Sequence, residues 1–195
     1  MKRLFDTLFS LLFLVFFLPF ALPIMALIFL EDRGPIFYRQ ERIGQFGKPF
    51  YLLKFRSMRL NADKDGKLTV GMKDQRITRI GYFIRKYKLD EFPQFINVLK
   101  GDMSIVGPRP EVKEYVDLYT PEQQQILNIK PGITDYASLA YFDESRLLGE
   151  SENPRETYIQ EIMPAKLELN KKYLANPTFT HDMKLMWMTF MKMVK

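Results

Sequence analysis

The longest apolar run of the chain lies at its N-terminus, where no charged residue occurs between Thr7 and Leu30. As a straight helix this run would be about 36 Å long, compared with roughly 30 Å for the hydrocarbon core of a bilayer. Pro19 and Pro23 lie in its second half, and Pro19 cannot donate a hydrogen bond to the carbonyl of Val15. The pattern therefore predicts a membrane helix kinked at Pro19, with two arms of about 18 Å that are each too short to cross the bilayer.

Basic residues flank this segment on both sides. Lys2 and Arg3 precede it, and the residues that follow it include Arg33, Arg39, Arg42 and Lys48. Because basic flanks favour the cytoplasmic side, we expect both ends to lie there and the helix to be re-entrant. One alternative is a single spanning helix, since prolines do occur in such helices. The other is a signal peptide, against which the length of the run and the lack of a small-residue cleavage site argue.

A second apolar stripe lies at the C-terminus. The residues at helical spacing are Met183, Met186, Trp187, Phe190, Met191 and Val194, and Lys184, Lys192 and Lys195 lie off the stripe. A tryptophan with flanking lysines on an apolar helix is typical of the membrane–water interface, so we expect an interfacial amphipathic helix. A helix that packs in a soluble core would show the same spacing.

Shorter patterns between the two ends predict the rest of the fold. Two β-prone runs, 36–38 and 50–53, are separated by Gly44 and Gly47 and predict a hairpin. The polar stretch 61–71 predicts a loop, and helices are expected over 77–87, 121–128 and 164–174. The expected fold class is α+β, mostly helical, with a small β element.

Composition restricts the chemistry that this chain can perform. Lys and Arg number 29 against 23 Asp and Glu, and the net charge of +6 favours an anionic partner such as phosphate, nucleic acid or an acidic membrane. The absence of cysteine excludes disulfides, a thiol nucleophile and a cysteine zinc site. A single histidine, His181, argues against a His-rich metal site or a Ser–His pair. Catalysis would then depend on carboxylates.

Asp90 and Glu91 are the candidate carboxylates. The apolar positions from 89 to 99 predict a helix that begins around Leu89 to Phe92, because Pro93 is tolerated only in a first turn, and Gly101 is a natural C-terminal cap. The N-terminus of a helix favours anions and keeps a carboxylate ionised. The segment just before the pair adds the positive charges of Arg85, Lys86 and Lys88.

This arrangement has two interpretations. A carboxylate among cations can attack phosphorus and form an aspartyl-phosphate type of intermediate, while the adjacent carboxylate helps to hold Mg²⁺. Alternatively, the Asp–Glu pair only caps the helix, which would stabilise it by about 1 kcal/mol and involve no chemistry.

The longer string from Asp90 to Pro110, DEFPQFINVLKGDMSIVGPRP, closely resembles the signature of the bacterial sugar transferases, which are monotopic polyprenyl-phosphate phosphoglycosyl transferases. Five more segments resemble that family in the same order: Lys2–Asp6, Gly34–Phe37, Gln40–Gly44, Lys54–Met58 and Lys130–Thr134. The resemblance covers nearly the whole chain, which is similar to the small members that consist of the catalytic core.

The resemblance implies that a sugar 1-phosphate is transferred from a UDP-sugar to polyprenyl phosphate, usually undecaprenyl phosphate, with release of UMP, at the start of a surface glycan pathway. Asp90 matches the nucleophile that takes the phosphosugar covalently. Glu91 matches its partner, and both are assigned to Mg²⁺, the expected cofactor. Arg85 matches a phosphate-binding arginine. Arg109 is a candidate nucleotide contact, or else a turn residue paired with a nearby acid, and Lys54 and Arg56 complete the candidate phosphate- or nucleotide-binding set.

The resemblance also implies an organisation. Residues 1–32 are expected to form a re-entrant membrane helix broken at Pro19. Residues 33–195 are expected to form a catalytic domain on the cytoplasmic face of the bacterial inner membrane, with the C-terminal helix at the interface. The expected partners are the UDP-sugar, polyprenyl phosphate and an anionic bilayer, and no nucleic acid.

Three departures from the family pattern concern the sugar that is transferred more than the reaction. Leu18 stands where a serine is frequent, Asp135-Tyr136 stands where Gly-Trp is frequent, and Asn170 stands at the position of an aspartate. Two rival hypotheses remain. The chain could be a membrane-tethered module that binds nucleic acid or acidic lipid, or it could catalyse a one-step displacement in which Asp90 is only a metal ligand.

Overall fold

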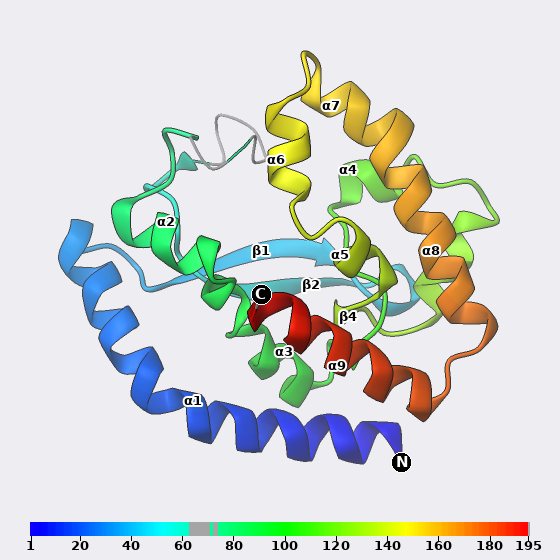
Figure 1. Cartoon of the computed structure of the whole chain (residues 1–195), viewed down its shortest axis with the longest axis horizontal. Helices are drawn as coiled ribbons and strands as arrows, with labels where there is room; N and C mark the ends of the chain where they lie inside the picture. The colour runs from blue at the N-terminus through cyan, green and yellow to red at the C-terminus, as the bar shows by residue number, and fades with distance from the viewer. Residues whose placement is uncertain (63–70, 72–73, 195) are drawn as a thin grey trace.

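A computed structural model describes residues 1–62, 71 and 74–194 of the chain. The described part is mostly helical and contains two small sheets (Figure 1). In chain order, its elements are α1 (Lys2–Asp32), β1 (Phe37–Ile43), η1 (Gln45–Gly47), β2 (Pro49–Phe55), α2 (Arg79–Lys86), η3 (Leu89–Glu91), α3 (Gln94–Lys100), β3 (Ser104–Val106), α4 (Lys113–Val116), η4 (Gln123–Asn128), β4 (Gly132–Thr134), α5 (Tyr136–Ala140), α6 (Glu144–Gly149), α7 (Pro154–Thr157), η5 (Tyr158–Ile162), α8 (Met163–Ala175) and α9 (Phe179–Val194). This confirms the expected α+β class.

The β element consists of two separate pairs of strands. The predicted hairpin is confirmed: β1 and β2 are antiparallel, with Phe37 opposite Phe55 and Ile43 opposite Pro49. The second pair was not predicted. In it, β3 and β4 run parallel, with Ser104 opposite Gly132. These strands have three residues each, too few for a hydrophobic period to be visible in the sequence.

Helix α1 carries the apolar N-terminal run and is bent near its middle, where it contains Pro19 and Pro23 (Figure 1). By length and composition it could cross a membrane: its most apolar window has a mean hydropathy of 2.8, and only 11% of that window is buried. Its exposed large apolar residues are Leu4, Leu8, Leu11, Leu12, Val15, Phe16, Leu18, Phe20, Leu22, Leu27, Phe29 and Leu30. Such a continuous apolar surface on a folded protein marks contact with lipid or another protein.

The opposite face of α1 packs on α3 through aromatic rings. The ring centroid of Phe13 lies 4.1 Å from that of Phe95 and 5.1 Å from that of Phe92. Phe17 packs edge-on against Phe92 at 4.5 Å. Because Phe92 directly follows Glu91, the helix that bears the membrane-type surface also supports the turn that carries the candidate carboxylates.

Polar contacts join the N-terminal end of α1 to the rest of the molecule. Lys2 Nζ donates hydrogen bonds to Val106 O at 2.9 Å, Tyr173 Oη at 2.8 Å and Asp182 Oδ2 at 2.6 Å. Arg3 donates to two carbonyls at the end of α3, at 2.5 and 3.0 Å.

The C-terminal end of α1 is joined to the same body. Glu31 accepts a hydrogen bond from Arg79 N at 2.8 Å and so helps to cap α2. Asp32 pairs with the buried Arg56 guanidinium. Residues 1–32 are therefore bound at both ends to the body formed by the later residues.

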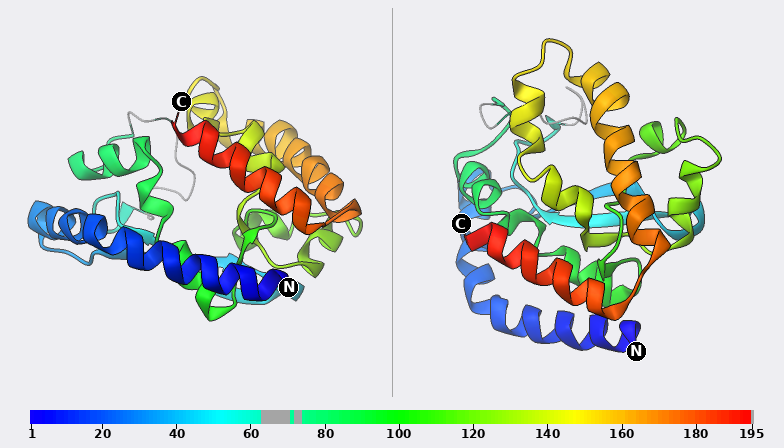
Figure 2. Two further views of the ribbon diagram at one scale, coloured as in Figure 1. Left: turned by 60° about the horizontal axis from the view of Figure 1, so that its bottom comes forward. Right: turned by 45° about the vertical axis from the view of Figure 1, so that its right-hand side comes forward.

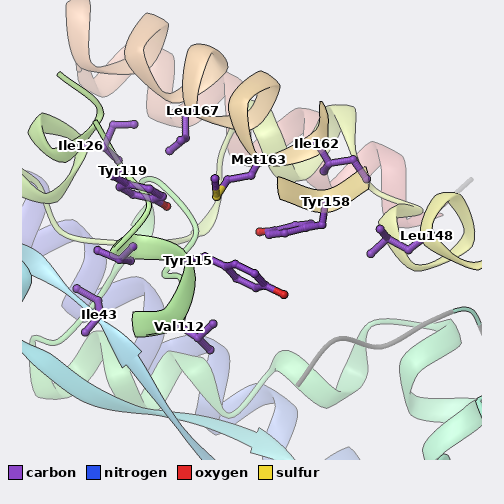
Figure 3. Close-up of a cluster of buried hydrophobic side chains, with 11 residues drawn as sticks. Ile43, Val112, Tyr115, Tyr119, Ile126, Leu148, Tyr158, Ile162, Met163 and Leu167 are labelled. Atoms are coloured by element: carbon purple, nitrogen blue, oxygen red, sulfur yellow. The ribbon is translucent and has the colours of Figure 1, made fainter. Parts of the chain in front are cut away.

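Three hydrophobic clusters form the core. Figure 3 shows the first, in which the aromatic residues Tyr115, Tyr119 and Tyr158 pack with aliphatic residues of α8 and η5 beyond one end of the hairpin. The second lies between β2, α3, β3 and α9, and Phe5, Phe9 and Phe13 of α1 pack against it. The third joins Ala21 and Ile28 of α1 to Phe55 and Ile84.

The predictions for the other segments are confirmed only in part. Helices α2 and α8 confirm those expected over 77–87 and 164–174, with ends shifted by one or two residues. Within the segment 121–128, residues 123–128 are helical, but they form the 3₁₀ helix η4 rather than an α-helix. Of the loop expected over 61–71, residues 63–70 lie outside the described part of the chain.

Helix α9 confirms the C-terminal helix and exposes Trp187, Phe190 and Met191 from the predicted stripe. Its fully buried residue is Leu185, which lies off that stripe. The exposure of the large apolar residues is the opposite of what a core-packing helix requires.

Candidate functional site

Asp90 and Glu91 lie in η3, a single 3₁₀ turn between α2 and α3. Pro93 occupies the N-cap position of α3, so the carboxylates precede this helix. The sequence had instead predicted a helix that begins around Leu89 to Phe92, with both carboxylates at its N-terminus. The turn is set up by Lys88, which has the left-handed φ of 55° that a side chain other than glycine rarely adopts. The predicted cap at the other end is confirmed, because Gly101 has a φ of 94°.

Glu91 is enclosed by two cations from different elements. Lys54 of β2 donates to Glu91 Oε1 at 3.0 Å. Arg109 donates from Nη1 to Glu91 Oε2 at 3.0 Å and from Nη2 to Oε1, in the bidentate geometry that binds a carboxylate most strongly. Both oxygens of Glu91 thus accept hydrogen bonds from cations. These bonds join the turn that carries Asp90 and Glu91, called the dyad below, to β2 and to the segment after β3.

These contacts fix the charge state of the cluster. Burial acts to raise the pKa of Glu91, but the charges of Arg109 and Lys54 outweigh it and hold that pKa well below its usual range. The charge of Glu91 raises the pKa of Arg109 further. Burial lowers the pKa of Lys54, although Glu91 opposes this shift. Glu91 is consequently ionised, and both of its oxygens are bound by Lys54 and Arg109.

Asp90 differs from its neighbour. It is 7% exposed, and none of the hydrogen bonds between side chains of the described residues reaches its carboxylate. Burial, followed by the charge of Glu91, raises the pKa of Asp90, while the charges of Lys54, Arg85 and Lys88 act in the opposite direction. A buried carboxylate that is surrounded by cations, yet not hydrogen-bonded by them, is more basic than an ordinary aspartate and remains available for bond formation.

The turn that presents Arg109 is held by close backbone contacts. A Cβ on Gly107 would lie 2.4 Å from Lys130 O, and a Cβ on Gly132 would lie 2.1 Å from Gly107 N, so only glycine allows β3 and β4 to approach in this way. Gly132 N donates to Pro108 O at 2.9 Å. Arg109 N donates to Asp135 Oδ2 at 3.2 Å.

Sequence reasoning did not foresee the role of Asp135. It is fully buried and also caps α5, accepting a hydrogen bond from Ser138 N at 2.6 Å. The Asp-x-x-Ser spacing at the start of a helix is the local signal that could have indicated a cap. Asn97 was also missed; its side chain donates to Tyr51 O at 2.8 Å and accepts from Leu53 N at 2.9 Å, which joins α3 to β2.

The other predicted anion-binding residues lie in different surroundings. Arg85 is half-buried and donates to Ser57 Oγ at 3.3 Å, and its charge acts on Asp90. Arg56 instead pairs with Asp32 and donates to Ile28 O at 3.3 Å, so its contacts join β2 to the end of α1. A nucleotide contact for Arg56 therefore stays a prediction that its present hydrogen bonds do not support.

The residues that depart from the family pattern lie in different parts of the structure. Leu18 is exposed on α1. Asn170 is 5% exposed, its Oδ1 has no hydrogen-bond partner among the described residues, and it lines a cavity of about 20 Å³ together with Arg109 and Pro110. A cavity of this size can hold one water molecule.

No group of three or more His, Asp or Glu side chains able to hold a metal occurs among residues 1–62, 71 and 74–194. Mg²⁺ generally binds to one or two carboxylates together with substrate phosphates and water. Asp90 and Glu91 fit that minimal set, with Asp90 as the carboxylate whose oxygens are not already bound to a cation.

Comparison with known proteins gives consistent results. The family model described as "Bacterial sugar transferase" matches residues 1–195. The chain is 37% identical over 194 residues to "Uncharacterized sugar transferase EpsL" of Bacillus subtilis. The matched region covers 100% of this chain and 87% of that protein. It is 34% identical over 172 residues to "UDP-glucose:undecaprenyl-phosphate glucose-1-phosphate transferase" of Escherichia coli (87% of this chain, 35% of the relative). It is 42% identical over 119 residues to "UDP-N-acetylgalactosamine-undecaprenyl-phosphate N-acetylgalactosaminephosphotransferase" of Aeromonas hydrophila (60% of this chain, 28% of the relative).

Proposed function

Because the chain belongs to the bacterial sugar transferase family, we propose that it transfers a sugar 1-phosphate from a UDP-sugar to undecaprenyl phosphate, with Asp90 as the covalent nucleophile. The general reaction follows from the relatives, which are named as undecaprenyl-phosphate sugar-phosphate transferases, and the chain is accordingly a transferase. The longer relatives extend well beyond the matched region, so the covalent step is argued from this chain's own residues.

The observation that carries the proposal is the contrast between the two adjacent carboxylates. Glu91 is bound on both oxygens by Lys54 and Arg109. Asp90 accepts no side-chain hydrogen bond from the described residues, and its pKa is raised by burial and by the charge of Glu91. A more basic carboxylate is a better nucleophile once it is ionised, and the surrounding cations favour ionisation.

The proposed reaction has two displacements at the same phosphorus. In the first, an Asp90 oxygen forms a bond to the phosphorus that bears the sugar, and the bond from that phosphorus to the oxygen it shares with UMP breaks, so that UMP leaves. In the second, a phosphate oxygen of the acceptor attacks the same phosphorus, and the Asp90 carboxylate is released. Each step exchanges one P–O bond for another and needs mainly alignment and neutralised charge.

The cations supply that neutralisation. Arg85 acts electrostatically on Asp90, and we assign it to the phosphate of the donor. Arg109 and Lys54 hold Glu91 in place, and their remaining N–H groups can bind the leaving phosphate. Asp90 and Glu91 are the residues that would hold Mg²⁺, and a bound Mg²⁺ would supply further positive charge to the phosphate oxygens.

We also propose that α1 is re-entrant and that the site lies on the cytoplasmic face of the inner membrane. The support is the attachment of both ends of α1 to one folded body, through Lys2 and Arg3 at one end and Glu31 and Asp32 at the other. A helix that crossed the bilayer once would have to release one of these ends.

The test is a comparison of Asp90→Asn with Asp117→Asn, an exposed aspartate that pairs with Lys113 on α4. Purified enzyme is incubated with Mg²⁺ and a panel of UDP-sugars, and UMP release is measured with and without undecaprenyl phosphate. With the donor alone, wild type and Asp117→Asn should release one UMP per enzyme and gain the mass of a phosphosugar. Asp90→Asn should do neither, while it still partitions into membranes.

Other outcomes separate the rivals. Turnover by Asp90→Asn would reject the assignment of the nucleophile. Turnover by wild type without any adduct on donor alone would favour a one-step displacement in which Asp90 binds only metal. Salt-sensitive binding to nucleic acid or acidic lipid without UMP release from any donor would favour a binding module.

A further inference from the structure

Next to the catalytic turn, three segments that are far apart in the sequence meet around the ring of Phe142. Lys88 Nζ lies 4.8 Å from the ring centroid and donates a hydrogen bond to Phe142 O at 3.1 Å. Lys192 Nζ, near the end of α9, lies 5.8 Å from the same centroid. We call these residues the Lys88–Phe142–Lys192 cluster.

Neither lysine of the cluster is held in an ion pair. Within residues 1–62, 71 and 74–194, the ion pairs include neither Lys88 nor Lys192. Attraction to the face of a phenyl ring is weak beside an ion pair, and two ammonium groups at one ring repel each other. An anion that reaches both ammonium groups would therefore be stabilised by both charges.

The position of Lys88 is specified by the backbone. Its left-handed φ of 55° is unfavourable for lysine, and the hydrogen bond to Phe142 O holds its side chain toward α5 and α6 instead of letting it extend into solvent. Its charge also acts to lower the pKa of both Asp90 and Glu91. Lys88 is thus within electrostatic range of these two carboxylates.

The cluster also borders the apolar surface of the molecule. On α9, Lys192 stands among the exposed residues Phe190, Met191 and Met193, and Trp187 is exposed one turn earlier. In the left-hand view of Figure 2, α1, α2 and α9 frame the segment that joins α2 to α3 and carries Lys88. A ligand held here would have its charged group near Asp90 and its apolar part along these helices.

We propose that the Lys88–Phe142–Lys192 cluster binds the phosphate of the polyprenyl acceptor. This inference rests on the proposed function, to which it adds a site for the second substrate. The two ammonium groups would hold the acceptor phosphate by charge-assisted hydrogen bonds. Its hydrocarbon chain would stay on the lipid-facing surface of α9 and α1. An oxygen of that phosphate then attacks the phosphosugar on Asp90, and the Asp90 carboxylate leaves.

Lys192 is the better residue for a test, because Lys88 also acts on the dyad whereas the charges named as acting on Asp90 and Glu91 do not include Lys192. Lys192→Met removes the charge and keeps a long side chain, and Lys192→Arg retains the charge. Lys184→Met is the matched control, because Lys184 is exposed on the same helix and takes part in none of the ion pairs among the described residues. The wild type and these three variants, each comprising residues 1–195, are placed in nanodiscs of phosphatidylcholine.

Binding of a ten-carbon polyprenyl phosphate is measured by calorimetry without donor, and the KM for each substrate is then measured by UMP release. Lys192→Met should weaken acceptor binding and raise the acceptor KM by about tenfold, the effect of losing one charge-assisted hydrogen bond. The donor KM and UMP release with donor alone should not change. Lys192→Arg should restore acceptor binding, and Lys184→Met should resemble wild type.

Equal acceptor affinity in wild type and Lys192→Met, or a wild type that gives no more heat than empty nanodiscs, would overturn the proposal. A headgroup of an anionic lipid offers the same chemistry. If Lys192→Met instead reduces binding only to phosphatidylglycerol vesicles, the ligand is such a headgroup and the proposal is wrong. A wild type that binds the acceptor but releases UMP from no UDP-sugar would reject the proposed reaction and leave this site intact.

Discussion

Glu91 and Arg109 form the most strongly coupled pair of the candidate site. Removing the charge of Glu91 would leave Arg109 and Lys54 without the carboxylate to which both donate. Glu91→Gln should lower the free energy of unfolding by about 3 kcal/mol, the usual cost of breaking a buried ion pair from one side. Chemical unfolding monitored by circular dichroism measures this cost.

A double-mutant cycle provides the control for that prediction. With Glu91→Gln in place, Arg109→Gln should cost much less than it costs in the wild type, because its partner is already lost, and the two effects should differ from additivity by at least about 1 kcal/mol. Additive effects would mean that the bidentate contact contributes nothing to stability.

Glu111 allows a prediction about pH, because it is buried between cations away from the dyad. It accepts a hydrogen bond from Tyr158 Oη and lies 3.4 Å from Arg42 Nη1 and 3.8 Å from Lys166 Nζ. Burial acts to raise its pKa, but the charges of Lys166 and Arg42 prevail and lower the pKa below the ordinary value of 4.5. A depressed pKa in the folded state contributes stability above the ordinary value and loses it as the pH falls through the folded-state value.

Glu111→Gln should therefore be less stable than wild type at pH 7, by about 2 kcal/mol. The difference should narrow once the pH falls below the ordinary value of 4.5, as Glu111 of the wild type becomes protonated. Thermal unfolding of both proteins between pH 7 and pH 3.5 tests this sign, and a difference that stays constant over that range would contradict it.

Among the elements, α1 and α3 are joined by aromatic rings that also contact the turn of Asp90 and Glu91. Phe13 packs on Phe92 and Phe95, whereas Phe16 of the same helix is 74% exposed. Phe13→Ala should cost about 3 kcal/mol of stability in detergent and should reduce UMP release, because Phe92 follows the dyad directly. Phe16→Ala should cost less than about 0.5 kcal/mol, since its ring faces the surroundings. Equal thermal stability of the two variants would show that the ring contacts are not needed.

Elements whose signal is local were predictable from the sequence. The apolar run of α1, the glycine-separated strands of the hairpin and the periodic face of α8 each contain their own pattern. The pair β3–β4 could not be predicted, because Ser104 and Gly132 meet only once the chain between them has folded.

The candidate site divides in the same way. The concentration of cations just before Asp90 and Glu91 could be predicted, because Arg85 and Lys88 are close to them in the sequence. The start of α3 was predicted too early, since Pro93 occupies its N-cap. The partners of Arg56 and Arg109 could not be predicted, because Asp32 and Glu91 reach them only through tertiary contacts. For the same reason the sequence could not show that the two adjacent carboxylates have different partners. In the structure, Arg109 and Lys54 both form ion pairs with Glu91 and not with Asp90.

At the scale of the whole molecule, the attachment of both ends of α1 restricts how the protein can sit in a bilayer. The apolar surface of α1 is exposed and long enough to enter a membrane, while Lys2 binds Asp182 and Asp32 binds Arg56 on one folded body. These ion pairs can all persist only if α1 enters the bilayer and returns, or lies within one leaflet, with its two ends on the same side.

Cysteine labelling tests this arrangement cleanly, because the chain has no cysteine of its own. A cysteine inserted between Met1 and Lys2, and the single variant Glu168→Cys, each place a thiol at an exposed position, the first at the N-terminus and the second on α8. In intact cells, both should react with a membrane-permeant maleimide and neither with an impermeant one, and permeabilisation should make both reactive to the impermeant reagent. Reaction of the N-terminal cysteine alone from outside intact cells would show that α1 spans the membrane. Lys2 could then no longer reach Asp182, and the contacts that hold α1 against the turn of Asp90 and Glu91 would have to break.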